Sequence, residues 1–257
     1  MTEHRSTLAA VIIEPFLLGP GGLIPQPDGY LERVVHAAKQ NDVTVIFDEV
    51  AVCMGRLGTI FAFEQLLSPL FAGVRGGLKP DIVCLAKGLT AGLLPLSAVL
   101  ASDSIYESFL GSYSQKRTFF HGHTFTGSAL GCAAALAAID QLSKPGFLET
   151  LQKNTIPAFW HALEKLRTHP HVGSLRGRGL MAGIELVRDK AGSIDYEWEQ
   201  RMGHRVVLAA RKRGINTRAI GNLVLAVPPL TITLDEIEFL SAGLSVSIDE
   251  SVLLSKS

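Results

Sequence analysis

The sequence has no surplus of charge of either sign, and none of its apolar runs is long. Lysine plus arginine and aspartate plus glutamate each number 24, so the net charge is zero. A balanced charge offers no basic surface for nucleic acids or anionic lipids. Glycine, proline or charged residues interrupt each apolar run before a membrane-spanning length, and residues 1–6 are too polar for a secretory leader. We therefore expect neither a nucleic-acid nor a membrane partner.

Cysteine is also scarce, with only Cys53, Cys84 and Cys132. Three is an odd number and no two of them form a CxxC pair, so we expect neither a disulfide framework nor a zinc site, and the simplest compartment is the reducing cytoplasm. His121 and His123 form an HxH pair without a third ligand nearby. We predict structural roles for them and no metal. Cys53 is predicted to be a buried small apolar residue.

What the sequence does contain is enough apolar material, 47% of 257 residues, to bury one large or two modest domains. Continuous apolar, β-branched runs predict buried strands, and apolar residues at helical spacing predict an amphipathic helix between the first two. The strands are expected at 8–14, 43–47, 81–85 and 96–100, and the helix at 31–40. Strands that alternate with helices predict an α/β fold with a mostly parallel sheet.

The second half changes character after an alanine-rich helix at 127–142, which we expect to be buried because small side chains permit close approach. Further helices are predicted at 147–168, 198–212 and 235–248, two short strands within 173–187, and a hairpin at 215–227. Arg176 and Arg178, in the turn between the two strands, are expected to be exposed or near the domain seam. We predict two domains, residues 1–150 and 151–257.

Two polar residues follow strands of the predicted sheet. Asp48 follows the strand at 43–47, and Lys87 follows the strand at 81–85 and precedes Gly88, which permits a sharp turn. Ligands of open α/β sheets bind beyond the carboxyl ends of the strands. A lysine amine can form a Schiff base with an aldehyde, and a carboxylate can keep a pyridine nitrogen protonated. The pair suits pyridoxal phosphate, although spacing alone leaves a helix cap at Asp48 and a solvated turn at Lys87 open.

The motifs around these residues occur in one order, namely VIIEP, IFDEV, GRLGTIFAFE, KPDIVCLAKGLTAGLLPLSAVLAS and HGHTFTGSALGCAAALAAI. Together they resemble the class III aminotransferases, and among them the adenosylmethionine-8-amino-7-oxononanoate aminotransferases, over residues 8–229. The resemblance implies a fold type I transferase with a large cofactor domain and a small α+β C-terminal domain. It also implies transfer of an amino group from a small donor to an oxo acid, 8-amino-7-oxononanoate, in biotin synthesis.

The resemblance also gives roles to particular residues. Lys87 is similar to the catalytic lysine that forms the Schiff base and moves the proton. Asp48 is similar to the partner of the pyridinium nitrogen, and Val50 to an aliphatic residue on the ring face. Thr124 resembles the threonine that binds the cofactor phosphate of the neighbouring subunit, with His123 beside it. From the residues alone, Thr124 could also be an ordinary hydroxyl at a strand end.

For the substrate, the resemblance implies that Gly122 lies close to it and that Arg218 holds its carboxylate. Arg218 could otherwise be a solvated hairpin residue. A site shared between subunits implies a homodimer. Three departures from the family stand out: residues 52–58 read VCMGRLG, Ser128-Ala129 replaces a pair usually like Asn-Pro, and residues 67–77 resemble a small insertion.

The family's enzymes are longer at the N-terminus, where the resemblance places a Gly-Ser turn for the phosphate and aromatic residues for the ring and the substrate. We therefore expect the chain to correspond to the second half of such an enzyme, truncated or split. Two alternatives stay open: an ω-amino acid aminotransferase of the same class, and a non-catalytic remnant that pairs with a full-length protein or an N-terminal half.

Overall fold

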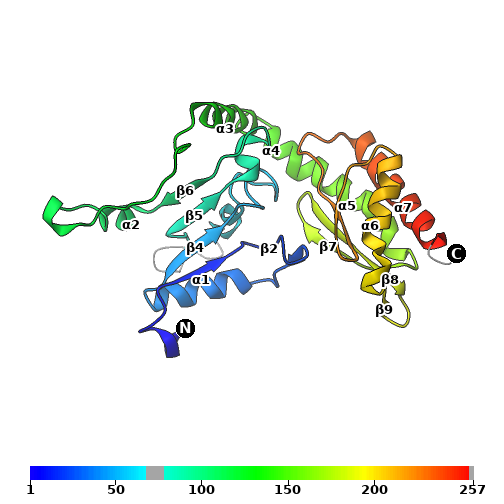
Figure 1. Cartoon of the computed structure of the whole chain (residues 1–257), viewed down its shortest axis with the longest axis horizontal. Coiled ribbons are helices and arrows are strands. Elements are labelled where there is room, and N and C mark those ends of the chain that lie inside the picture. The colour runs from blue at the N-terminus through cyan, green and yellow to red at the C-terminus, as the bar shows by residue number, and fades with distance from the viewer. Residues whose placement is uncertain (68–77, 255–257) are drawn as a thin grey trace. The chain divides into compact units, whose positions relative to one another are not determined.

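A computed structural model of the chain describes residues 1–67 and 78–254 (Figure 1). The chain forms two compact units. The first consists of Met1–Phe16, Gln26–Gly55 and Thr59–Pro145, and the second of Leu17–Pro25, Arg56–Gly58 and Gly146–Ser257. The domain boundary expected between residues 150 and 151 stays a prediction. The predicted insertion at 67–77 lies outside the described residues except for Leu67.

The first unit is built on a four-stranded sheet in the order β1-β4-β5-β6. Its strands are β1 (Ala10–Ile13), β4 (Thr44–Asp48), β5 (Ile82–Leu85) and β6 (Ala98–Ala101). β1, β4 and β5 are parallel, whereas β6 runs antiparallel to β5. The predicted α/β fold with a mostly parallel sheet is confirmed, and the antiparallel edge strand is an addition that the sequence pattern did not reveal.

Helix α1 (Tyr30–Gln40) supplies the apolar core of this unit together with β4. Leu31, Val35 and Ala38 recur at helical spacing and are buried. Val45 and Phe47 alternate along β4 with less buried neighbours, so one face of the strand packs against the buried side of α1. The helix and the strands predicted for residues 8–100 are therefore confirmed to within about two residues at their ends, the usual uncertainty of such boundaries.

The rest of the first unit is short helices and one long helix. They are η1 (Thr2–His4), η2 (Ala62–Leu67), η4 (Lys87–Thr90), α2 (Asp103–Glu107), η5 (Tyr113–Gln115) and α3 (Ala129–Leu142). Figure 1 shows α2 and the segment after it leading away from β6 before the chain returns to α3. Every residue from 106 to 127 is exposed. We call residues 106–127 the exposed arm.

The prediction that the alanine-rich helix is buried is wrong for this chain. In α3 only Gly131, Ala135 and Leu142 are buried, and Leu130 and Leu136 are 75% and 62% exposed. The small residues do allow one close approach, because a Cβ at Gly131 would lie 3.3 Å from a methyl carbon of Leu96. One side of the helix packs in this way, and the opposite side faces solvent.

The second unit is an antiparallel sheet covered by helices. The strand order is β10-β11-β8-β7, with β9 paired to β8, and β2 and β3 form a separate hairpin. The strands are β2 (Leu17–Leu18), β3 (Ile24–Pro25), β7 (Val172–Arg178), β8 (Met181–Asp189), β9 (Ile194–Asp195), β10 (Ala219–Ile220) and β11 (Leu223–Ala226). The predicted strand pair and hairpin are confirmed.

Residues 147–168 form one helical run, as expected, with a π-helical turn inside it. The parts are α4 (Phe147–Thr150), η6 (Leu151–Thr155), α5 (Ile156–Glu164) and η7 (Lys165–Thr168). The predicted start of the next helix, at residue 198, is wrong. Arg201 has a φ of 48° and separates η8 (Trp198–Gln200) from α6 (Met202–Lys212). A residue in the left-handed region cannot continue a right-handed helix.

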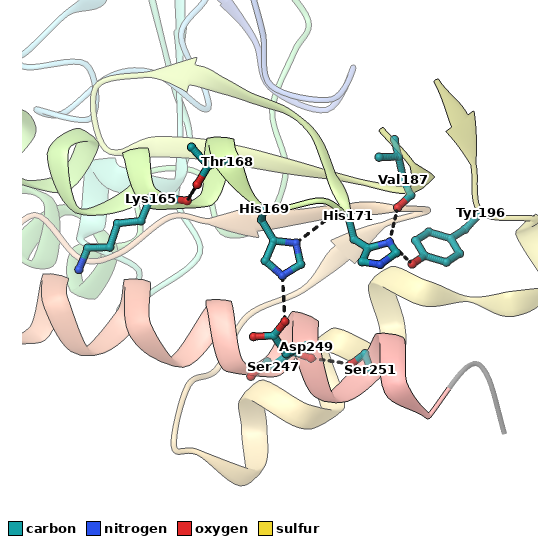
Figure 2. A network of polar contacts seen from close by, with 9 residues as sticks. All are labelled: Lys165, Thr168, His169, His171, Val187, Tyr196, Ser247, Asp249 and Ser251. Carbon is teal, nitrogen blue, oxygen red and sulfur yellow. Dashed lines mark hydrogen bonds and ion pairs between the residues drawn. The ribbon is translucent and has the colours of Figure 1, made fainter. Parts of the chain in front are cut away.

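Helix α7 (Leu234–Leu253) is longer than predicted and starts at a capping box, in which Thr233 accepts a hydrogen bond from the Glu236 amide. Its far end is fastened by a polar network (Figure 2). His169 Nδ1 accepts from the His171 amide, so the neutral ring donates through Nε2, 3.1 Å from Asp249 Oδ1. The network thus joins the end of the 147–168 run to α7.

Close backbone packing in the second unit gives a stability prediction. A Cβ on Gly203 of α6 would lie 2.2 Å from the Gly221 carbonyl oxygen, whereas a Cβ on Gly214 would meet nothing within 4 Å. We expect Gly203→Ala to lower the free energy of unfolding by about 2–3 kcal/mol or more, because rigid backbone must move. Gly214→Ala should lose only the roughly 1 kcal/mol of its left-handed conformation. Denaturant unfolding compares the two, and equal losses would contradict the described packing.

Candidate active site

Asp48 and Lys87 lie at the carboxyl ends of neighbouring parallel strands. β4 ends at Asp48, which pairs with Cys84 of β5. β5 ends at Leu85, and Lys87 follows as the first residue of η4. The Asp48 carboxylate is close enough to Cys84 that, after burial, it is the second cause raising the pKa of that thiol. The predicted adjacency of the two strand ends is confirmed. That both side chains line one cleft stays a prediction.

The turn at Lys87 has an unusual backbone. Ala86 is fully extended, and Lys87 then has a φ of 45°, in the left-handed region. That conformation costs a lysine about 1–2 kcal/mol, and such strain concentrates at functional sites. Gly88 permits the turn, because a Cβ there would lie 3.0 Å from Cβ of Met54. Lys87 itself is exposed.

The loop that follows Asp48 packs beneath this turn. The Glu49 amide donates to the Cys84 carbonyl at 3.0 Å, which continues the β4–β5 pairing. The Val50 amide donates to Asp48 Oδ1 at 3.1 Å and so fixes the orientation of that carboxylate. Cys53 is buried, as predicted, and burial raises the pKa of its thiol to about 11. A thiol with so high a pKa is a poor nucleophile at neutral pH.

Sequence reasoning missed Glu49. Its side chain is fully buried, and its carboxylate accepts hydrogen bonds from the amides of Ala62 at 2.7 Å and Phe63 at 2.8 Å. Burial raises its pKa to about 7, although the two amides lower it and Glu64 adds to the rise. The Asp-Glu pair at the end of an apolar strand was the available signal, because the two residues should point to opposite faces.

His121, Gly122, His123 and Thr124 lie in the exposed arm, between η5 and α3. Thr124 lies in a turn, so the alternative of a strand-end hydroxyl is wrong. The segment has local hydrogen bonds: the His123 amide donates to Thr126 Oγ1 at 2.9 Å, and the Phe125 amide donates to His123 Nδ1 at 3.1 Å. These bonds shape the turn and leave the side chain of Thr124 at the surface.

Arg218 belongs to the second unit. Its side chain is exposed, and its carbonyl accepts from the Leu225 amide at 3.0 Å just before β10. Its substrate role stays a prediction. Arg176 was expected to be exposed or near the domain seam, and the first of these alternatives is wrong. It is partly buried and donates to Glu185, Ser174 Oγ and the Gly22 carbonyl, because β7 and β8 bring Glu185 beside it.

Residues 1–67 and 78–254 offer neither a cluster of metal-binding side chains nor a membrane-spanning helix. There, three or more histidine, cysteine, aspartate or glutamate side chains nowhere gather in a way that could hold a metal ion. The same residues contain no helix of the length and apolarity that crossing a bilayer requires.

The sequence profile of the class III aminotransferases matches residues 1–247. The chain belongs to this family. Among curated relatives, the adenosylmethionine-8-amino-7-oxononanoate aminotransferase of Geobacter sulfurreducens is 44% identical over 248 residues, which are 96% of this chain and 52% of that protein. The enzyme of the same name from Methanocaldococcus jannaschii is 43% identical over 98% of this chain and 53% of its own length.

Solved structures agree with the family. The crystal structure of the Methanocaldococcus jannaschii protein matches with a TM-score of 0.90 at 42% identity, over 97% of this chain and 55% of that one. A thermostable (S)-enantioselective omega-transaminase from Thermomicrobium roseum matches with a TM-score of 0.83 at 35% identity, over 97% of this chain and 53% of that one. The mixed α/β fold is thus that of the fold type I transaminases, and the chain spans about half the length of the relatives it matches.

Class III aminotransferases are pyridoxal-phosphate enzymes, and the donor set of the first unit fits that cofactor. An anionic carboxylate, Asp48, is held in place by the Val50 amide. A lysine follows the neighbouring strand with its side chain exposed. A carboxylate for a protonated ring nitrogen and an amine for an aldehyde are the two groups that the cofactor needs from adjacent strand ends.

The strained turn gives a prediction that needs no cofactor. Glycine adopts the left-handed region without the Cβ penalty, so we expect Lys87→Gly to be more stable than Lys87→Ala by about 0.5–1 kcal/mol. The order should reverse at Lys153, which lies in a helix, where alanine exceeds glycine by about 1 kcal/mol. The denaturant midpoints of the alanine and glycine variants at Lys87 and at Lys153 test this expected order. An alanine advantage at both positions would show that Lys87 is not strained.

Proposed function

We propose that the chain forms the catalytic-lysine part of an aminotransferase that makes 7,8-diaminononanoate from 8-amino-7-oxononanoate for biotin synthesis. The observation that carries the proposal is the placement of Asp48 and Lys87 at neighbouring ends of parallel strands. The names of the relatives in Geobacter and Methanocaldococcus support the substrate. S-adenosylmethionine is the amino donor that those names suggest, and the cytoplasm is the compartment.

Five residues would hold pyridoxal phosphate. Asp48 would meet the ring nitrogen, Val50 a ring face, and Lys87 the aldehyde carbon. Thr124 would bind the phosphate of a neighbouring subunit, with His123 beside it. The bound cofactor supplies an electron sink for the substrate carbon that loses its proton.

The chain's own residues then orient the reactants and move a proton. The hydrogen bond from the Val50 amide holds the Asp48 carboxylate in one rotamer. The Lys87 Nζ, at the exposed start of η4, carries the proton to and from the substrate carbon as general base and acid. Arg218 would bind the substrate carboxylate through two parallel N–H donors, which lysine cannot provide, and Gly122 would leave space beside it.

A second candidate, ω-amino acid transamination, is favoured by the likeness to the omega-transaminase of Thermomicrobium roseum. The two functions differ in the acceptor and share the cofactor. Activity of the assembled enzyme toward 8-amino-7-oxononanoate and toward simple ω-amino acids separates them, and Arg218→Ala should raise the KM only for the acceptor whose carboxylate it binds.

We infer that the active species is an assembly, a homodimer or a pair with a separate N-terminal half. Exposed apolar surface supports this. In the exposed arm Phe120 is 92% exposed, and in the sheet Ile12 of β1 and Val99 of β6 are 64% and 65% exposed. Contiguous apolar patches beyond a few hundred Å² usually mark association surfaces. A monomer that stays soluble and ignores an N-terminal half would favour the non-catalytic remnant.

A titration with a large excess of pyridoxal phosphate, which offsets the weak binding expected of the chain alone, tests the role of Lys87. We expect a visible absorption band that Lys87→Ala abolishes, because only a lysine beside Asp48 is held for covalent attachment. Lys153→Ala is the matched control, since Lys153 is an exposed helical lysine paired with Glu149. A band that persists in Lys87→Ala, or disappears in Lys153→Ala, would place the cofactor on another lysine.

Turnover by these 257 residues alone should be absent or very weak. Phosphate contacts are charge-assisted hydrogen bonds worth about 1.5–3 kcal/mol each. The resemblance places the phosphate-binding turn in the part of the relatives that this chain does not span, and two or three lost contacts weaken binding roughly a thousandfold or more. Co-expression with the N-terminal half of the Geobacter relative should restore cofactor binding and activity. Robust turnover without it would contradict this account.

A further inference from the structure

The buried carboxylate of Glu49 closes the base of a loop. Its two oxygens accept from the Ala62 and Phe63 amides, so a side chain at the end of β4 is joined to the start of η2. The loop between them is also held together near its middle, where the Met54 amide donates to the Ile60 carbonyl at 2.6 Å. A buried carboxylate is tolerated only with such partners, and losing one leaves a polar group unsatisfied.

The same loop touches the chain on both sides of Lys87. The Cys53 thiol lies 3.8 Å from the carbonyl oxygen of Ala86, the residue before Lys87. Met54 packs against Gly88, the residue after it, so closely that a Cβ on Gly88 would be 3.0 Å from Met54 Cβ. Lys87 and Met54 both have a positive φ, 45° and 54°, so two strained residues lie on the two sides of this contact.

We propose that Glu49 is a positioning residue for Lys87. Its carboxylate fastens the loop to Ala62 and Phe63, the loop holds Cys53 and Met54 against Ala86 and Gly88, and this support keeps Lys87 in its left-handed turn. Strained backbone persists only where its surroundings over-determine it, and the Glu49 loop is the surrounding structure that the contacts identify. The catalytic meaning of the inference rests on the proposed function, whereas its structural content does not.

The charged groups around Glu49 give the proposal a pH signature. Glu64 of η2 interacts electrostatically with it and raises its pKa. The Cys53 thiol lies on the same loop and interacts electrostatically with Glu49 and with Lys87 of η4. The pKa of Glu49 is raised from 4.5 to about 7. The closed loop therefore binds a proton more tightly than an opened, solvated one. Closure is favoured below about pH 4.5 and is progressively lost as the pH rises through about 7.

Amide hydrogen exchange of the whole chain without cofactor tests the support. Glu49→Gln keeps the shape but turns an NH2 group toward one of the two amides. We expect exchange at Ala62, Phe63 and the residues from Ala86 to Thr90 to rise about 10- to 100-fold, the equivalent of about 1.4–2.8 kcal/mol for a buried amide left unsatisfied. Both carboxyl oxygens of Glu49 can accept from an amide in either protonation state, whereas the NH2 group of glutamine cannot accept. The decrease in protection between pH 5 and 7.5 should also disappear. Glu64→Gln, which removes a nearby charge without removing a loop bond, is the control.

The amine of Lys87 supplies a second readout that a purely structural role would not move. Reductive methylation with formaldehyde and a borohydride reductant, followed by mass spectrometry, should give Lys87 a changed rate and pH profile in Glu49→Gln, while Lys153 stays the same. Glu49→Asp keeps the charge on a shorter side chain and should show a smaller change. It is the replacement test variant if Glu49→Gln lowers global stability.

Faster exchange confined to Ala62 and Phe63, with Lys87 unchanged, would overturn the proposal and leave Glu49 a local anchor. Both measurements use the chain without cofactor, so their outcome is independent of any failure to find aminotransferase activity. An active enzyme with an unchanged Lys87 profile in Glu49→Gln would reject the positioning role alone.

Discussion

The pairing of β4 with β5 is the constraint on which the candidate site depends. Because the two strands are parallel and in register, with Asp48 opposite Cys84, their carboxyl ends fall at one edge of the sheet. An acid and a lysine far apart in sequence are thereby brought to neighbouring strand ends. Helix α1 fills one face of these strands, and the loop after Asp48 packs against the turn that carries Lys87.

Those turns show how local strain and support are combined. Lys87 occupies a backbone region that disfavours any side chain with a Cβ, and Gly88 is the small residue that lets the neighbouring loop approach. The residues by which this loop departs from the family, Val52, Cys53 and Met54, are all buried. Their side chains therefore pack the interior of the loop, and a carboxylate, Glu49, holds its base.

Much of the fold was predictable because its signals are local. The continuous apolar runs of the parallel strands, the helical spacing of Leu31, Val35 and Ala38, and the Asp48–Lys87 pair all read directly from the sequence. The burial of α3 was not predictable, because alanines permit packing without specifying a partner. The break at Arg201 was missed because a single left-handed residue leaves no mark on hydrophobic periodicity. Glu49 was missed because its partners are backbone amides, which every sequence has.

We propose that Asp48 and Lys87 together form a pyridoxal-phosphate site. The most direct test is a crystal structure of the chain assembled with a matching N-terminal half and the cofactor. We expect continuous electron density between Lys87 Nζ and the aldehyde carbon, and an Asp48 carboxylate oxygen about 2.7–2.9 Å from the ring nitrogen. Cofactor joined to another lysine, or a ring nitrogen without the Asp48 carboxylate beside it, would contradict the claim.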